Sequence, residues 1–292
     1  MKLNNKIGVI VDSFKSGVRE GLIKAKQAGA DGVQIYAVSG EMDPAALNPQ
    51  QRRELRKYIG SLGLEVSALC GDLGGHGFQD RAANRAKVEQ SKRIMDLALD
   101  LGSPIVTTHI GIIPEDKNSE VYAALHDACT ELGNYAKSVN AYFAIETGPE
   151  TAAHLKQFLD SLPTNGVSVN FDPANMAMVT GDDPVQGVYL LKDYIVHTHA
   201  KDGVRLRSID PRDVYGFYGY EGMNHAHIAE MAEQGEAFRE VPLGKGSVDF
   251  DSYFQALQDI GYEGYLTIER EVGENPEEDI RNAVQFIKQY RS

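Results

Sequence analysis

Four ionisable side chains stand where short, β-rich segments of this sequence end: Glu146, Asp172, His199 and Glu269. Three carboxylates gathered beside one imidazole would repel one another unless a cation lay between them. A hard or borderline divalent ion suits a set of mostly oxygen ligands, so we expect Mn²⁺ first and then Mg²⁺ or Co²⁺. The residue types indicate a site for one metal, provided that the fold brings them together; separate polar groups bonding to loops are the alternative.

The alternation of side chains predicts that all four residues point in the same direction. Successive side chains in a strand lie on opposite faces. Phe143 and Ile145 are expected to face surrounding helices, which turns Glu146 inward. The same phase in the later segments turns a polar set inward: Ser168, Asn170, Asp172, His197, His199, Lys201, Thr267 and Glu269. Polar residues at the carboxyl ends of parallel barrel strands form active sites in such folds.

The elements that must position these residues repeat as strand followed by helix. Asn48-Pro49, Asp183-Pro184 and Asn275-Pro276 each predict a helix start with a capping side chain and proline at the first position. Gly29, Gly102 and Gly261 mark expected helix ends. The expected strands are Lys6–Val11, Gly32–Tyr36, Leu64–Leu69, Pro104–His109, Ala141–Glu146, Gly166–Asp172, Tyr194–His199 and Gly264–Glu269.

Eight such units predict an α/β fold of the (β/α)8 TIM-barrel type, with residues 1–292 forming a single domain. An open doubly wound sheet and a barrel with one strand misassigned are the competing arrangements. No GxGxxG or GxxxxGK[ST] motif follows the first strand, which removes the main support for a nucleotide-binding sheet.

One connection is much longer than the others and follows the seventh strand. It runs from Lys201 to about Asp249, and we expect it to form a lid-like insertion with a short helix near Asn224–Gln234. Its aromatic residues could cover a sugar ring, or pack on the barrel or on a partner subunit: Tyr215, Phe217, Tyr218 and Tyr220.

The bulk composition narrows the class of partner. With 29 Lys+Arg against 42 Asp+Glu, the net charge of −13 argues against nucleic acid. Two cysteines, Cys70 and Cys129, do not make a disulfide framework, and they favour a reducing compartment. No secretory segment and no long apolar span is apparent, so we expect a cytoplasmic protein that does not bind membranes. A homo-oligomer is left open.

Five segments resemble the xylose-isomerase-like superfamily of sugar phosphate isomerases and epimerases, which are TIM barrels. They are Ala144-Ile145-Glu146-Thr147-Gly148, Asn170-Phe171-Asp172-Pro173-Ala174-Asn175, His197-Thr198-His199-Ala200-Lys201-Asp202, Pro242-Leu243-Gly244-Lys245-Gly246 and Gly261-Tyr262-Glu263-Gly264-Tyr265-Leu266-Thr267-Ile268-Glu269. They cover the C-terminal half, whereas the first hundred residues match only in general pattern. The resemblance implies that Glu146, Asp172, His199 and Glu269 bind one metal, often manganese. In the ketose 3-epimerases of this superfamily, the two glutamates also exchange a proton with the substrate carbon.

Other positions refine what the resemblance implies. The ketose 3-epimerases carry a histidine three residues after the metal aspartate, where this chain has Asn175, which we expect to contact substrate. Arg205, six residues after His199, matches the arginine that helps to hold the ketose. The His-x-Lys-Asp form from His199 to Asp202 is typical of a broader isomerase/dehydratase branch.

Further substrate contacts are expected around the same end of the barrel. His109 ends the fourth strand and could contact substrate or make a structural hydrogen bond. Lys201 shares the face of His199 and could bind a substrate oxygen, or lie solvated in the loop. His76 stands in the glycine-rich segment 71–77, which could wrap a substrate or form a flexible turn. His197, one layer deeper, is expected to be a hydrogen-bonded interior residue.

The expected activity is metal-dependent proton transfer next to the carbonyl of a ketose, sugar phosphate or related polyol, giving isomerisation or epimerisation. Glu146 and Glu269 are the expected acid and base. Loss of a β-hydroxyl or β-glycosyl group from the same enediolate would make the enzyme a lyase on a keto-cyclitol or 3-keto-glycoside. A relative of the DNA-repair endonucleases and a non-catalytic sugar-binding barrel are the remaining alternatives.

Overall fold

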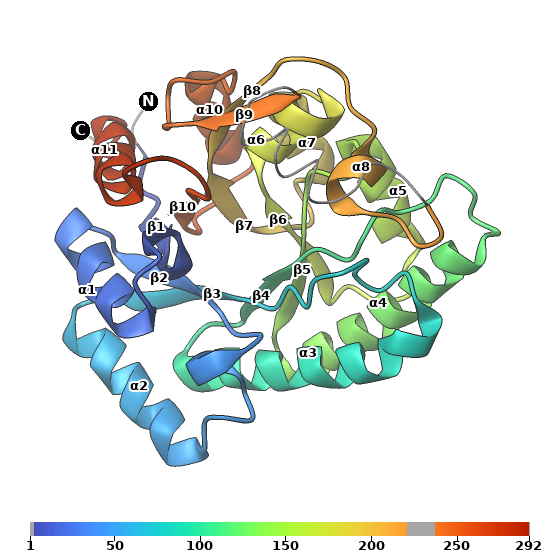
Figure 1. Cartoon of the computed structure of the whole chain (residues 1–292), viewed down its shortest axis with the longest axis horizontal. Helices are drawn as coiled ribbons and strands as arrows, with labels where there is room; N and C mark the ends of the chain where they lie inside the picture. Colours follow the sequence, from blue (N-terminus) through green and yellow to red (C-terminus); the bar gives the residue numbers. More distant parts are fainter. Residues whose placement is uncertain (1–2, 221–236, 292) are drawn as a thin grey trace.

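Eight parallel strands close into a barrel in the computed structural model, which describes residues 3–220 and 237–291 (Figure 1). Neighbouring strands follow the order β1-β10-β7-β6-β5-β4-β3-β2, so the predicted TIM barrel is confirmed and the open sheet was the wrong alternative. The barrel strands are β1 (Ile7–Ile10), β2 (Gly32–Tyr36), β3 (Glu65–Cys70), β4 (Ile105–Thr108), β5 (Tyr142–Glu146), β6 (Val167–Phe171), β7 (Ile195–Ala200) and β10 (Leu266–Ile268).

Helices surround the barrel (Figure 1). They are α1 (Val18–Ala28), α2 (Pro49–Ser61), α3 (Arg81–Leu101), α4 (Glu120–Val139), α5 (Ala152–Ser161), α6 (Pro173–Asn175), α7 (Pro184–Leu191), α8 (Pro211–Tyr215), α10 (Phe250–Asp259) and α11 (Pro276–Gln289). Short 3₁₀ turns lie at Val11–Phe14 and Gly40–Met42, and a π-helical turn at Met176–Thr180 follows α6. Within the described part of the chain, no helix combines the length and apolarity needed to cross a bilayer.

Local hydrogen bonds in the structure account for the helix boundaries that the sequence predicts. Asn48 accepts from the backbone of Gln50 and Gln51 and forms a capping box at the start of α2. The side chains of Asp183 and Asn275 also accept backbone hydrogen bonds at the starts of α7 and α11, each before a proline. Gly29 and Gly102 end α1 and α3 in the left-handed region, with φ of 89° and 97°.

The barrel interior is polar, as the strand phase predicts. Asn170 Oδ1 accepts a hydrogen bond from Nδ1 of His197 at 2.8 Å, and His197 Nε2 lies 2.9 Å from the Thr267 hydroxyl. These three inward residues are completely buried. Phe143 and Ile145 belong instead to the apolar layer between strands and helices. The prediction that His197 is a hydrogen-bonded interior residue is confirmed.

The insertion after β7 begins with a strand. β8 (Asp202–Arg205) pairs antiparallel with β9 (Phe238–Val241), and α8 lies between them in sequence. The Asp202 carboxylate accepts backbone hydrogen bonds from Gly244, Gly246 and Val248, which ties β8 to the segment that precedes α10. The helix predicted near Asn224–Gln234 lies outside the described residues, and the role of the insertion as a lid stays a prediction.

Candidate metal centre and active site

The four ionisable residues at the strand ends converge. One ligand atom from each of Glu146, Asp172, His199 and Glu269 lies within 4.8 Å of the others. His199 Nδ1 stands 3.2 Å from Asp172 Oδ2, 3.3 Å from Glu269 Oε2 and 3.6 Å from Glu146 Oε1. The residues come from the carboxyl ends of β5, β6, β7 and β10, so the barrel register brings together side chains that are up to 123 residues apart (269 − 146). This buried Glu/Asp/His/Glu group could hold a divalent metal.

The surroundings of His199 fit a metal ligand. Gln34 Nε2 donates to the Thr107 hydroxyl at 3.1 Å, which turns Gln34 Oε1 toward His199 Nε2, also at 3.1 Å. With Nε2 placed to donate to Gln34, Nδ1 is the nitrogen that faces the carboxylates and would bind a metal in place of a proton. Burial lowers the pKa of His199, but the carboxylates of Glu269 and Glu146 outweigh it and raise that pKa well above its usual value. The same negative field favours a cation in this position.

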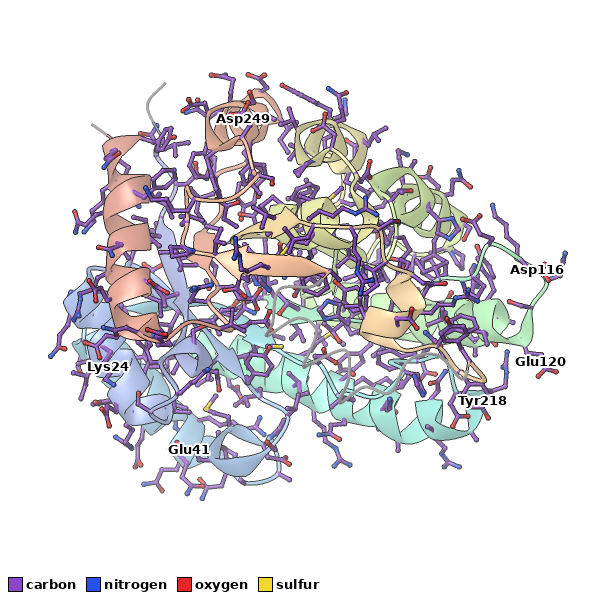
Figure 2. All side chains as sticks on the ribbon, turned by 45° about the horizontal axis from the view of Figure 1, so that its top comes forward. Lys24, Glu41, Asp116, Glu120, Tyr218 and Asp249 are labelled. Atoms are coloured by element: carbon purple, nitrogen blue, oxygen red, sulfur yellow. The ribbon has the colours of Figure 1, made fainter. Side chains whose placement is uncertain are left out.

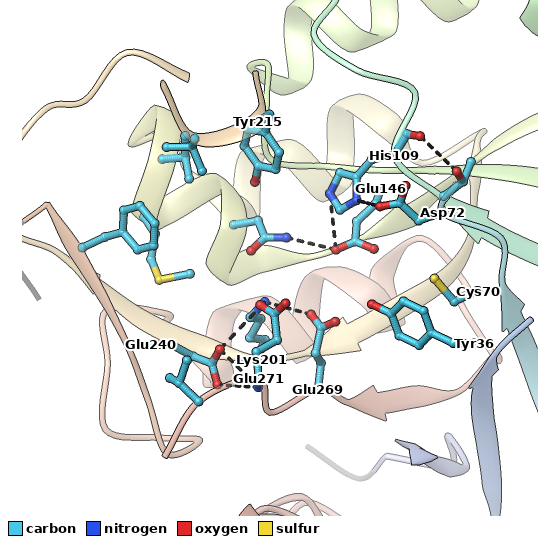
Figure 3. Close-up of a pocket in the computed structure, with 17 residues that line it drawn as sticks. Tyr36, Cys70, Asp72, His109, Glu146, Lys201, Tyr215, Glu240, Glu269 and Glu271 are labelled. Atoms are coloured by element: carbon cyan, nitrogen blue, oxygen red, sulfur yellow. Dashed lines mark hydrogen bonds and ion pairs between the residues drawn. The ribbon is translucent and has the colours of Figure 1, made fainter. Parts of the chain in front are cut away.

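The four residues differ in depth. Asp172 and His199 are completely buried, whereas Glu146 and Glu269 line a cavity of about 320 Å³ at the mouth of the barrel (Figure 3). The other residues around this cavity are Tyr36, Cys70, Asp72, Thr108, His109, Asn175, Met178, Val179, Lys201, Val214, Tyr215, Phe238, Glu240, Glu271 and Val272. A small molecule in the cavity would therefore meet the two glutamates and not the aspartate or histidine.

Local structure after β6 places Asn175 against Glu146. Asp172 is the N-cap of α6, with Pro173 in the first helical position, and its Oδ1 accepts from the Asn175 backbone at 2.8 Å. The Asn175 amide then donates to Glu146 Oε1 at 3.0 Å. Asn170 donates to the other oxygen of Glu146 at 3.1 Å. Glu146 thus accepts hydrogen bonds from two neutral amides, and the imidazoles of His199 and His109 lie 3.6 and 3.8 Å from its Oε1.

Glu269 is held by a cation instead. Lys201 Nζ lies 2.9 Å from Glu269 Oε2, contacts Glu271 Oε2 and lies 4.0 Å from Glu240 Oε2. Burial lowers the pKa of Lys201, but the nearby carboxylates outweigh burial and hold that pKa well above its ordinary range. Lys201 is 3% exposed, so it is a buried ammonium and not a solvated loop residue. Glu240 belongs to β9 and shows that the insertion contributes to the cavity wall (Figure 3).

His109 occupies the opposite wall. Its Nδ1 lies 3.2 Å from Asp72 Oδ2, and its Nε2 lies 3.8 Å from Glu146 Oε1. Burial lowers the pKa of His109, yet Glu146 and Asp72 together raise it to about 9. The Tyr215 ring packs on the imidazole with centroids 5.4 Å apart. Gly148 leaves room for this ring, because a Cβ there would lie 2.5 Å from the Tyr215 hydroxyl oxygen.

Two expected substrate contacts do not reach this cavity. Arg205 donates to the Thr180 carbonyl at 2.9 Å and to the Ser208 hydroxyl at 3.1 Å, and it lines a separate cavity of about 580 Å³. His76 lies in the glycine-rich segment and does not line the 320 Å³ cavity. Among the aromatic residues of the insertion, Tyr215 reaches this cavity, whereas Tyr218 is 51% exposed at the edge of the molecule (Figure 2).

Several cavity residues were not singled out in the sequence. Asp72 follows β3 by two residues and could have been found by the same strand-end rule as Glu146. Glu271 lies two residues after Glu269, so the alternation of side chains along the strand would have placed it on the same side. Tyr36 ends β2. Glu240 carries no such signal, because its position depends on the pairing of β9 with β8.

The chain belongs to the xylose isomerase-like TIM-barrel family, whose model matches residues 22–290. The matched range includes all four candidate metal ligands. The solved structure of a xylose isomerase domain protein from Planctomyces limnophilus has a TM-score of 0.78 and 26% identity, covering 100% of this chain and 98% of that one. A D-tagatose 3-epimerase-like protein shares the fold, with a TM-score of 0.72 and 19% identity over 98% of this chain and 96% of its own.

Among curated relatives, an inosose dehydratase of Lacticaseibacillus casei is 27% identical over 144 residues, or 48% of this chain. The match spans 44% of that relative, less than half of its length. The proteins similar to this chain are therefore named for different reactions, among them a 3-epimerase-like protein and a dehydratase.

Proposed function

We propose that this protein is a divalent-metal-dependent isomerase or epimerase that transfers a proton at the carbon next to the carbonyl of a keto-sugar or related polyol. The observation that carries the proposal is the division of the four candidate ligands. Glu146 and Glu269 face the cavity, and Asp172 and His199 lie wholly buried behind them. Two carboxylates that share one metal and also meet the substrate can serve as base and acid.

The proposed chemistry assigns a task to each residue. A bound divalent metal, for which these ligands favour Mn²⁺, would polarise the carbonyl and make the neighbouring carbon-bound proton more acidic. Glu146 and Glu269 take up and return that proton from different sides of the cavity. Lys201 holds Glu269 as a carboxylate, and the amide of Asn175 orients Glu146. Tyr215 and Phe238 narrow the cavity and limit the entry of water.

A dehydratase is the second candidate, and two observations favour it. The curated relative from Lacticaseibacillus casei is an inosose dehydratase. In addition, His109 places an imidazole 3.8 Å from Glu146, beside the cavity. Loss of a β-hydroxyl would start with the same proton abstraction and would need a second group of this kind near the departing oxygen.

The test is a screen of ketoses, keto-glycosides and inososes in deuterated water with the Mn²⁺-loaded protein. We expect one compound class to gain deuterium at the carbon next to the carbonyl. Glu269→Gln and Glu146→Gln should each slow this exchange by at least about a hundredfold, because a general base is removed. Glu89→Gln, on the exposed face of α3, is the matched control.

The products separate the two candidates. Recovery of a deuterated isomer or epimer supports the first, and an α,β-unsaturated ketone that has lost its β-oxygen substituent supports the second. Isomerisation without any solvent deuterium in the product would indicate hydride transfer and would overturn the roles given to the two glutamates.

A further inference from the structure

Carboxylates outnumber cations around the cavity of about 320 Å³ at the barrel mouth. The described residues that line it include one lysine and no arginine, against five carboxylates: Asp72, Glu146, Glu240, Glu269 and Glu271. Residues 221–236, which belong to the insertion, contain four glutamates and neither lysine nor arginine. No lysine or arginine from that segment can therefore offset the negative charge of the cavity wall.

The basic side chains of the described wall are already paired within the protein. Lys201 Nζ lies 2.9 Å from Glu269 Oε2 and also contacts Glu271 (Figure 3). On the opposite wall, His109 Nδ1 lies 3.2 Å from Asp72 Oδ2. An anionic group of a substrate would have to compete with these carboxylates for either base.

The position where (β/α)8 barrels often bind phosphate is filled by a side chain of this protein. Such barrels frequently hold phosphate at the loops that follow the seventh and eighth strands. After β7, the backbone N–H groups of Gly244 and Gly246 donate to Asp202 Oδ2 at 3.0 and 2.7 Å, and Val248 N donates to Oδ1 at 3.2 Å. A Cβ on Gly246 would lie 2.1 Å from Asp202 Oδ1, so the loop closes tightly around this carboxylate.

The connection after β10, the last barrel strand, does not provide an anion site either. Arg270 is buried and donates to Glu240 at 2.6 Å and to Asp279 at 2.9 Å. The helix that follows, α11, carries three acidic residues in its first turn: Glu277, Glu278 and Asp279. Negative side chains at the start of a helix oppose the binding of a further anion there.

We propose that the substrate is an uncharged polyhydroxy ketone, and that Glu271 excludes phosphorylated and carboxylated sugars. A bound divalent metal and Lys201 would together balance the three carboxylates of the candidate ligand set, and Arg270 pairs with Glu240. The charge of Glu271 then remains uncompensated. Its side chain lines the cavity and is 58% exposed, so it lies where the cavity meets solvent. This inference rests on the proposed proton transfer and narrows its substrate class.

The same carboxylates suit the hydroxyl groups of a sugar. A carboxylate accepts hydrogen bonds and a hydroxyl donates one, whereas an ionised phosphate or carboxylate group brings acceptors and a like charge. The cavity of about 320 Å³ stands at the lower end of the range of about 300–1,000 Å³ that is usual for small-molecule sites. Its size therefore favours a single monosaccharide or cyclitol.

The test compares matched pairs of compounds in the Mn²⁺-loaded protein. The probes are D-fructose, D-tagatose, D-ribulose and scyllo-inosose, each beside its phosphate monoester on a hydroxyl remote from the carbonyl. Deuterium exchange at the carbon next to the carbonyl gives kcat/KM for both members of a pair. For every compound that exchanges, we expect the phosphate ester to be at least about a hundredfold less reactive, because like charges face each other in the cavity.

Salt separates repulsion by charge from exclusion by size. Raising the NaCl concentration screens the partly exposed charge of Glu271, so the preference for the unphosphorylated member of a pair should become smaller. A steric barrier to the larger ester would not respond to salt. A preference that stays constant from low to high salt would therefore overturn the role given to charge.

Glu271→Gln tests the residue to which the exclusion is assigned. Glutamine keeps the size of the side chain and removes the charge, so the preference should fall by about tenfold or more. Both members of a pair are measured on the same variant, so a loss that they share cancels in the ratio. Glu131→Gln is the matched control, because Glu131 is 57% exposed and pairs with Lys92. An unchanged preference in Glu271→Gln would contradict the assignment.

Two further outcomes keep this inference separate from the proposed function. If the phosphate esters exchange deuterium as readily as the unphosphorylated compounds, the substrate class is wrong and the proposed function stands. Absence of exchange with both members of every pair and with the wider screen would refute the proposed function, and this inference with it.

Discussion

The side-chain nitrogen of Lys201 lies 2.9 Å from Oε2 of Glu269, and both side chains are almost fully buried. Glu146, the matching carboxylate across the cavity, is approached by the amide of Asn175 at 3.0 Å. The two glutamates therefore lie in different electrostatic surroundings. Lys201 stabilises the ionised form of Glu269, so the pair of carboxylates is not symmetric.

Replacing Lys201 tests how much this buried cation contributes to the stability of the folded protein. Lys201→Gln leaves Glu269 and Glu271 without their partner, so we expect the free energy of unfolding to fall by about 3 kcal/mol in the metal-free protein. Urea denaturation in the presence of a chelator measures it. Lys156→Gln breaks an exposed pair with Asp160 and should change the stability far less. An unchanged urea midpoint for Lys201→Gln would contradict the view that Lys201 offsets the buried charge of Glu269.

Metal content tests the four-residue site. We expect about one divalent ion per chain in the purified protein, and most of it should be lost in Asp172→Ala and in His199→Ala. Elemental analysis gives the content, and circular dichroism checks that the barrel remains folded. Asp127→Asn, an exposed residue paired with Arg81, is the control. Full metal occupancy in Asp172→Ala would mean that the site is drawn wrongly.

The insertion can be shortened without cutting its sheet. Leu206 N donates to the Ala237 carbonyl at 2.9 Å, next to the last pair of β8 and β9, so an Asn-Gly turn in place of residues 207–236 would close a hairpin there. This removes Tyr215 and Val214 from the cavity wall. We expect metal binding to be kept and turnover to fall by about tenfold or more, because water enters the site. Unchanged turnover would identify the insertion as an interface or as decoration.

Glu150 predicts a pH dependence of stability. Burial raises its pKa to about 7 from 4.5, although its carboxylate accepts a hydrogen bond from Ile113 N at 2.7 Å. Because the folded-state pKa is raised, this group contributes stability that is fully present below pH 4.5 and is lost as the pH rises through 7.

Glu150→Gln keeps the acceptor and removes the ionisation. As the pH rises from 4.5 to 7, the free energy of unfolding of the variant should increase relative to that of the parent protein. Above pH 7 the variant should be the more stable of the two, by at most about 3 kcal/mol. Urea midpoints measured from pH 4 to pH 8 follow this difference. Parallel pH curves for the two proteins would show that Glu150 does not titrate in this range.

The sequence by itself determined the barrel and the convergence of its strand-end residues. These features follow from local rules: alternation along each strand places Glu146 and His199 inward, and capping side chains such as Asn48 mark where helices begin. A closed parallel barrel then collects every strand end on one face. Asn175 could also be placed, because it stands one helical turn from Asp172.

Only the tertiary structure decided which partners surround that set. The pairing of Asp72 with His109 depends on the path of the loops after β3 and β4, and Glu240 enters the cavity because β9 pairs with β8. Arg205 turns instead to the Thr180 carbonyl. Loop paths and cross-element contacts have no sequence period, because they depend on the packing of segments that are distant in the chain.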